Sequence, residues 1–129
     1  MKATQVRAII FAVAITLLVA CIAFAILLRP RILDIESIDL NTVEDGTYTG
    51  VYQNKILLAA VQVEIADHAI VSIDILEHKD AYMPQARQIA GDVLDTQSLE
   101  VDAISGATLT SNTVLKAIED ALQQGVSSE

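Results

Sequence analysis

The residues most able to do chemistry lie together near the C-terminal end of the chain. Positions 102–111 read Asp-Ala-Ile-Ser-Gly-Ala-Thr-Leu-Thr-Ser, with four hydroxyls around a turn of small residues. An amphipathic run follows at once, so we expect a helix to begin here. The first amides of a helix have no internal partner and carry the positive end of the helix dipole. An anion, above all a phosphate, is therefore a natural ligand of this loop.

The small residues of the loop suit close contact with a ligand. Gly106 and Ala107 leave the backbone accessible, because neither has a side chain that would clash. The hydroxyls that surround them belong to Ser105, Thr108, Thr110 and Ser111. A second interpretation needs no ligand, since any of the polar residues 110–112 would serve as an ordinary helix N-cap. On physical grounds alone, both interpretations stay open.

The elements that must hold this loop follow from the hydrophobic pattern. Three β-strands are expected, at 47–52, 56–65 and 71–75, because apolar and polar side chains alternate there and turn residues separate the runs. A short further strand at 99–101 would lead into the loop.

Helical spacing predicts one helix at 83–94 and a second one after the loop, ending at Gly125. We therefore expect an α+β domain over 43–124, a small antiparallel sheet with two helices packed on one face, and a C-terminal tail at 125–129.

The N-terminal part has the composition of a membrane span. Ala8–Leu28 contains no charged residue. At about 1.5 Å per residue it spans roughly 30 Å, the thickness of a bilayer core. We expect residues 1–31 to form a short tail and a single transmembrane helix, about 8–28, and 32–42 to form a connector, either a short helix or an extended spacer. Leu18–Cys21 also resembles a lipobox, so a lipoprotein anchored at Cys21 is the minority alternative.

The charge distribution limits the possible partners. All 17 acidic residues follow Arg31, whereas only four basic residues do, so the part after the apolar run has a net charge of −13. Such a domain repels nucleic acid and anionic headgroups, and nucleic-acid binding is excluded. The sequence contains no metal-ligand cluster, no Ser-His-Asp set and no P-loop, so we assign no catalytic residue and no metal site.

The loop resembles the flavinylation motif of the FMN-binding domain family. That motif reads Asp, two variable residues, Ser or Thr, Gly, Ala, then Thr or Ser, and residues 102–108 match it completely. Asp45–Gly50 resembles the usual opening of the domain, and Ile75–Asp80 the segment after its third strand. The resemblance covers roughly 43–122. The family includes subunits of the sodium-translocating NADH:quinone reductase and of the ion-translocating ferredoxin:NAD reductase complex.

This resemblance implies covalent FMN, attached by a phosphoester to the hydroxyl of Thr108. A separate flavin transferase would install it from FAD, with magnesium. Asp102 would either be recognised by the transferase or order the loop, the alternative being a solvated turn residue. Gly106 and Ala107 would give access, and Ser105, Thr110 and Ser111 polar support.

The resemblance also places Glu77 and His78 in a segment that tends to line the flavin site. A lone histidine near a strand end is more often structural. Tyr48, Tyr52 and Tyr82 could stack on the flavin ring, although ordinary packing is the default for each.

The possible functions of this protein all include membrane anchorage. We expect a membrane-anchored flavoprotein that relays electrons between membrane or envelope redox partners. The alternatives are an FMN-bearing subunit of a reductase complex with a definite substrate, and a non-redox membrane-tethered binding module. The resemblance implies a single-pass protein of the bacterial cytoplasmic membrane, in contact with membrane lipid, with its flavin domain outside the cytoplasm.

Overall fold

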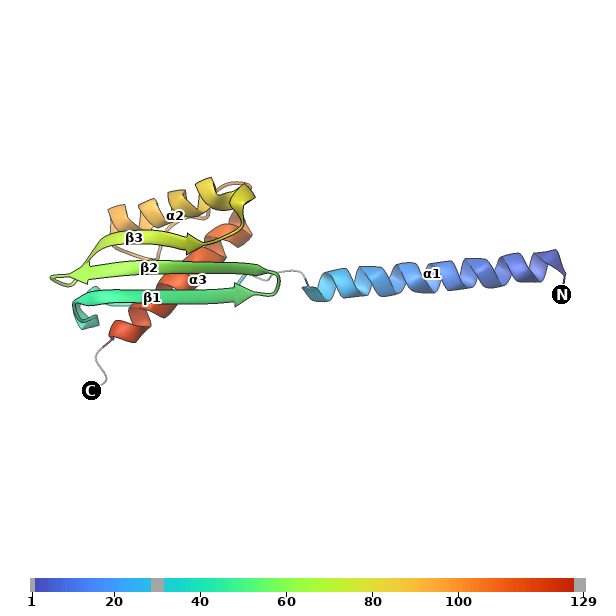
Figure 1. Ribbon diagram of the computed structural model, residues 1–129, viewed down its shortest axis with the longest axis horizontal. Helices are drawn as coiled ribbons and strands as arrows, with labels where there is room; N and C mark the ends of the chain where they lie inside the picture. The colour runs from blue at the N-terminus through green and yellow to red at the C-terminus, as the bar shows by residue number, and fades with distance from the viewer. Residues whose placement is uncertain (1, 29–31, 127–129) are drawn as a thin grey trace.

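The computed structural model describes residues 2–28 and 32–126 and consists of a long helix followed by a small α+β domain (Figure 1). The elements in chain order are α1 (Ala3–Leu28), β1 (Gly46–Asn54), β2 (Leu57–Ala66), β3 (Ala69–Glu77), α2 (Met83–Thr96) and α3 (Thr108–Gly125). Two short 3-10 helices, η1 (Leu40–Thr42) and η2 (Asp80–Tyr82), precede β1 and α2. The end of the predicted tail, 127–129, lies outside the described residues.

The sheet is an antiparallel meander of the order β1-β2-β3, as the alternating pattern predicted. Asn54 pairs with Leu57 across the first hairpin, and Ala66 pairs with Ala69 across the second. Alternate side chains of β2 are fully buried, among them Val61 and Val63. One face of the sheet is therefore covered and the other faces solvent.

Both domain helices lie on the covered face, which confirms the predicted fold class (Figure 1). α3 crosses β1 and β2, whereas α2 packs against β3 and α3. The largest fully buried side chains come from the two helices and the sheet and include Ile89, Val93, Ile118 and Leu122. β1 and α3 approach so closely that a Cβ at Gly50 would overlap the carbonyl oxygen of Ala117.

Two local predictions were wrong. Residues 97–107 form neither helix nor strand, so the strand expected at 99–101 is absent from this described segment. α3 begins at Thr108, inside the motif, and its N-cap is Ala107. The polar residues 110–112 are therefore buried within the helix instead of capping it.

α1 is long and apolar enough to cross a membrane, and a signal sequence near an N-terminus has the same character. Its side chains, Cys21 included, are exposed. The described part of the predicted connector, 32–42, has an irregular stretch followed by η1. It is not a free spacer, because backbone groups of Leu33 and Glu36 are hydrogen-bonded to side chains of α3.

Candidate functional site

A tight turn brings the chain into the first residue of α3. The amide of Ala107 donates to the carbonyl of Ile104 at 2.9 Å, which closes a four-residue turn. Gly106, the third residue of this turn, has φ +78°, a conformation that glycine adopts without the steric cost of a Cβ. The motif thus needs its glycine for the shape of the backbone.

Ser111 fastens this turn to the helix. The amide of Ile104 donates to Ser111 Oγ at 2.9 Å, and the same hydroxyl donates to the carbonyl of Ala107 at 2.8 Å. Ser111 is fully buried. Its hydroxyl therefore holds both ends of the turn and does not face the solvent.

Thr108 is the first residue of α3, and its side chain is exposed. Ala107, at the N-cap, has only a methyl group and cannot accept a hydrogen bond from the first helical amides. Those amides have no acceptor within a helix. The first turn of α3 therefore presents backbone donors, the positive end of the dipole and a free hydroxyl at one place.

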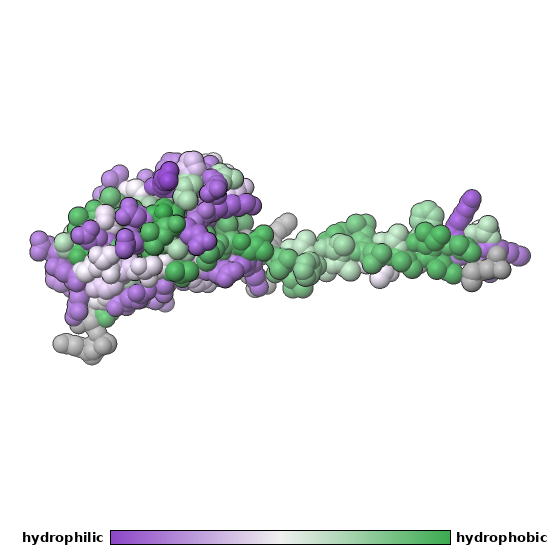
Figure 2. All heavy atoms as spheres, viewed as in Figure 1, coloured by the Kyte–Doolittle hydropathy of each residue, from purple (hydrophilic) through white to green (hydrophobic). Residues whose placement is uncertain are grey.

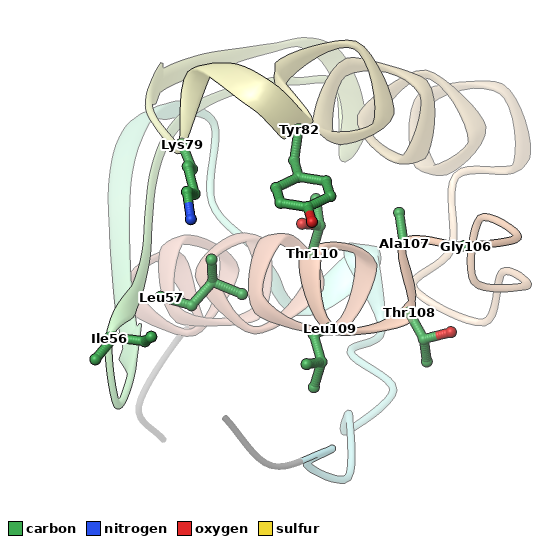
Figure 3. A pocket seen from close by; sticks show the side chains of 9 residues that line it. All are labelled: Ile56, Leu57, Lys79, Tyr82, Gly106, Ala107, Thr108, Leu109 and Thr110. Atoms are coloured by element: carbon green, nitrogen blue, oxygen red, sulfur yellow. The ribbon is translucent and has the colours of Figure 1, made fainter. Parts of the chain in front are cut away.

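A cleft of about 540 Å³ opens beside this turn, within the size range of small-molecule sites. Its lining comes from the β1–β2 turn, the segment before α2 and the start of α3 and consists of Ile56, Leu57, Lys79, Tyr82 and 106–110. Figure 3 shows Lys79 and Tyr82 reaching over the cleft from one side and Ile56 and Leu57 at its other edge. The lining is largely apolar, with one cation and one aromatic ring.

His78 is buried and contacts Thr110, one of the residues that line the cleft. Its Nδ1 lies 2.9 Å from the carbonyl of Leu58, and its Nε2 lies 3.2 Å from Thr110 Oγ1. Burial lowers the pKa of His78 below its usual 6.5, although the hydrogen bond to Leu58 opposes this shift. The imidazole is therefore neutral at pH 7. Since a carbonyl only accepts, Nδ1 carries the proton and Nε2 accepts from Thr110.

A family model described as the FMN-binding domain matches residues 59–123, half of the chain. The chain belongs to the FMN-binding domain family. No curated protein matches it. The family match begins in β2 and ends in α3, so this FMN-binding domain includes the turn, the first turn of α3 and most of the covered sheet face.

The residues present fit FMN. The phosphate group of FMN suits the free amides and positive dipole end at the start of α3. The flat, largely apolar flavin ring suits the lining of the cleft, where Leu57 and Tyr82 offer apolar and aromatic surface. Lys79 supplies a positive charge at the same cleft.

The predicted site residues of this FMN-binding domain separate into three groups. Gly106, Ala107, Thr108 and Thr110 line the cleft. Ser111 and His78 are buried and are hydrogen-bonded to two lining residues, Ala107 and Thr110.

Three others lie elsewhere. Asp102 is exposed and borders a separate hollow with Asp92, Asp95 and Glu100. Ser105 is exposed on the turn, outside the residues that line the cleft. Glu77 is exposed and borders a neighbouring hollow beside His78.

Of the three tyrosines, only Tyr82 lines the cleft. The hydroxyl of Tyr48 donates to the carbonyl of Glu44, and the ring of Tyr52 lies 5.6 Å from Lys116 Nζ. Sequence reasoning missed Ile56, Leu57, Lys79 and Leu109. One signal was available for Ile56, because a large apolar residue is unusual in a two-residue β-turn.

Proposed function

We propose that this protein is a membrane-anchored flavoprotein that carries FMN covalently on Thr108 and relays electrons in a redox chain of the cell envelope. The observation that carries the proposal is the exposed hydroxyl of Thr108 in the first turn of α3, next to an apolar cleft. The complete flavinylation motif at 102–108 supports the same residue.

Attachment needs an external enzyme. A threonine hydroxyl is a weak nucleophile unless a base activates it. Among the described residues, none is hydrogen-bonded to the Thr108 side chain to serve as that base, whereas its exposure gives a flavin transferase access. In the proposed step, Thr108 Oγ attacks the riboflavin-side phosphorus of FAD. The phosphorus–oxygen bond to AMP breaks, AMP leaves, and the hydroxyl proton passes to a base of the transferase.

The chain's own residues would hold the product and shield it. The first amides of α3 would bind the remaining negative charge of the phosphodiester. Ile56, Leu57 and Tyr82 would exclude water from the cleft, and Lys79 would place a cation beside a group that becomes more negative on reduction. When bound, FMN supplies the capacity to accept and donate electrons.

The cellular setting is part of the proposal. α1 would cross the bacterial cytoplasmic membrane once, and the flavin domain would lie outside the cytoplasm, where a covalent bond prevents loss of the cofactor. Membrane lipid, the transferase and envelope redox proteins would be the partners. A reporter fused after Glu129 should be active only if it functions outside the cytoplasm, and cytoplasmic activity would contradict this orientation.

Co-expression with an active flavin transferase tests the attachment. The full chain should then give a flavin-fluorescent band on a denaturing gel and the intact mass of one esterified FMN. Thr108→Ser should retain flavin, because it keeps the hydroxyl. Thr108→Val should lose flavin, because it replaces the hydroxyl by a methyl group and changes nothing else.

Thr49→Ala is the matched control, since Thr49 is an exposed hydroxyl residue on β1, away from the cleft. It should be labelled as well as the wild type. A dark wild-type band despite an active transferase, or a fluorescent Thr108→Val band, would contradict the proposal.

A further inference from the structure

The tip of the β1–β2 hairpin carries an apolar side chain, Ile56, that borders the cleft and is otherwise exposed. Asn54 pairs with Leu57, so the turn consists of Lys55 and Ile56 alone. Ile56 is 71% exposed, more than any other large hydrophobic side chain among the described residues, those of α1 included. Burying such a side chain contributes about 1.5–3 kcal/mol. A partner that covered the exposed part of Ile56 would gain part of this free energy.

The net charge of the β1–β2 hairpin also differs from that of the rest of the domain. From Gly46 to Val63 the sequence contains no acidic residue, and Lys55 at the tip is its only charge. Acids outside the hairpin at the cleft end include Glu77, at the end of β3, and Asp80, in η2. A lysine beside an isoleucine is the pair that suits a bilayer surface, because the apolar chain enters while the ammonium stays among headgroups.

The connector fixes this end of the domain to the chain that leads to α1. The side chain of Asn112 binds both backbone groups of Leu33: its Oδ1 accepts from the amide at 2.9 Å, and its Nδ2 donates to the carbonyl at 2.7 Å. Glu119 Oε2 accepts from the amide of Glu36 at 3.0 Å. Residue 33 is thus clamped to α3 within two turns of Thr108.

Chain length then limits the distance to the membrane. Leu33 is the fifth residue after Leu28, the end of α1, so their Cα atoms are at most about 18 Å apart. The headgroup layer on each side of a bilayer is itself several ångströms thick. If α1 spans the membrane, the clamped end of the domain must lie at or close to the headgroups.

The cleft shares this end of the domain. Ile32 and Thr108 line one hollow, and Thr108 and Ile56 line the cleft. Figure 1 shows the β1–β2 turn and the first turns of α2 and α3 at the end of the domain toward α1, and Figure 2 shows hydrophobic atoms there. The acidic hollow around Asp92 and Asp95 lies at the opposite end of α2 from this cleft.

From these observations we infer that the β1–β2 tip docks on the surface of the bilayer that α1 crosses, with Ile56 inserted among the lipids and Lys55 among the headgroups. The cleft then opens at the membrane surface. The net charge of −13 opposes this docking mainly through the acids that lie close to the headgroups, because charges farther than about 8 Å are largely screened at physiological salt. This inference rests on the proposed membrane anchorage.

Site-specific labelling of the full chain in lipid nanodiscs with one copy each tests the docking. In a Cys21→Ser background, Ile56→Cys carries an environment-sensitive fluorophore, and Val71→Cys is the matched control. Val71 is also an exposed apolar residue, but it lies near the β2–β3 turn. Lipids with a nitroxide near the glycerol end of the acyl chain should quench most of the fluorescence at position 56 and little at position 71.

Further labels separate the possible failures. A label on native Cys21, within α1, should be quenched by lipids with the nitroxide deep in the bilayer. Quenching at 21 with equal, weak quenching at 56 and 71 would overturn the docking but leave the anchor. No quenching at 21 would overturn the anchor and with it this inference, whereas the gel test for flavin on Thr108 would stand. Position 56 could instead be shielded only in vesicles that contain many copies of the chain. Its partner would then be a second copy and not the bilayer, and the inference would be overturned.

Discussion

In the second half of α3 the helix presses on β1 so closely that Gly50 has no room for a Cβ, and Ala117, Ile118 and Ala121 are fully buried. In its first turn, the same helix leaves Thr108 exposed, has no side-chain cap and follows a glycine turn with open space around it. The difference shows how one helix both holds the fold and serves a ligand. Close packing at one end fixes the helix, and the unsatisfied groups at the other end can then stay in place for an anion.

The largest effect should come from filling the packed end. Gly50→Ala would push a Cβ into the backbone of α3, which cannot yield like a flexible side chain, so we expect a loss of about 3 kcal/mol in the free energy of unfolding. Urea denaturation of the full chain in detergent, followed by circular dichroism, measures it.

Gly106→Ala is the matched control at the open end. A Cβ there would meet nothing within 4 Å, and only the φ of +78° opposes it. The expected loss is about 1 kcal/mol. Equal losses for the two variants would contradict the distinction between the packed end and the open end.

The next effect concerns the hydroxyl that joins the turn to the helix. Ser111→Ala would leave the amide of Ile104 without its acceptor, and we expect a loss of about 2 kcal/mol. Thr113→Val is the control, since Thr113 is equally buried but its hydroxyl only donates to the carbonyl of Leu109 within the helix. Amide hydrogen exchange at Ile104 should be faster in Ser111→Ala alone. Unchanged exchange there would show that Ser111 does not hold the turn.

Much of the fold could be predicted from the sequence, because local patterns determine it. The alternation of apolar and polar residues in the strands and the helical spacing at 83–94 indicate which side chains face the core. The structure confirms both the strands and the helix. The first residue of α3 could not be located from the sequence, because Thr110 and Ser111 look like caps there. Their hydroxyls are instead satisfied inside the fold, by His78 and by the turn.

The cleft could be predicted only in part, because its two edges are 50 residues apart in the chain. Gly106, Ala107 and Thr108 were found from the motif, which is local, and Thr110 from its hydroxyl just after the motif. Ile56 and Lys79 reach the same cleft only through the hairpin and the end of β3, and no local pattern links them to the motif. The clamp of Asn112 on Leu33 was hidden for the same reason.

A smaller effect should appear with pH, at the junction of the sheet with the first turn of α3. The pKa of His78 in the folded state lies below its unfolded value of 6.5, so the unfolded state binds more protons and the folded state loses stability as the pH falls below 6.5. The slope cannot exceed about 1.4 kcal/mol per pH unit for one group. His78→Gln should lack this part of the pH dependence between pH 7 and 5, and His68→Gln should keep it.

The smallest effect on stability should come from the residue with the largest effect on the flavin. Thr108→Val keeps the shape of the side chain and removes only an exposed hydroxyl, so the free energy of unfolding of the flavin-free protein should change by less than about 0.5 kcal/mol. The same variant should carry no flavin after co-expression with the transferase. A marked loss of stability would mean that the hydroxyl is part of the packing of α3, like that of Ser111. An unchanged unfolding curve together with a dark band would show that the hydroxyl of Thr108 does not stabilise α3. Its role would then be the attachment of flavin.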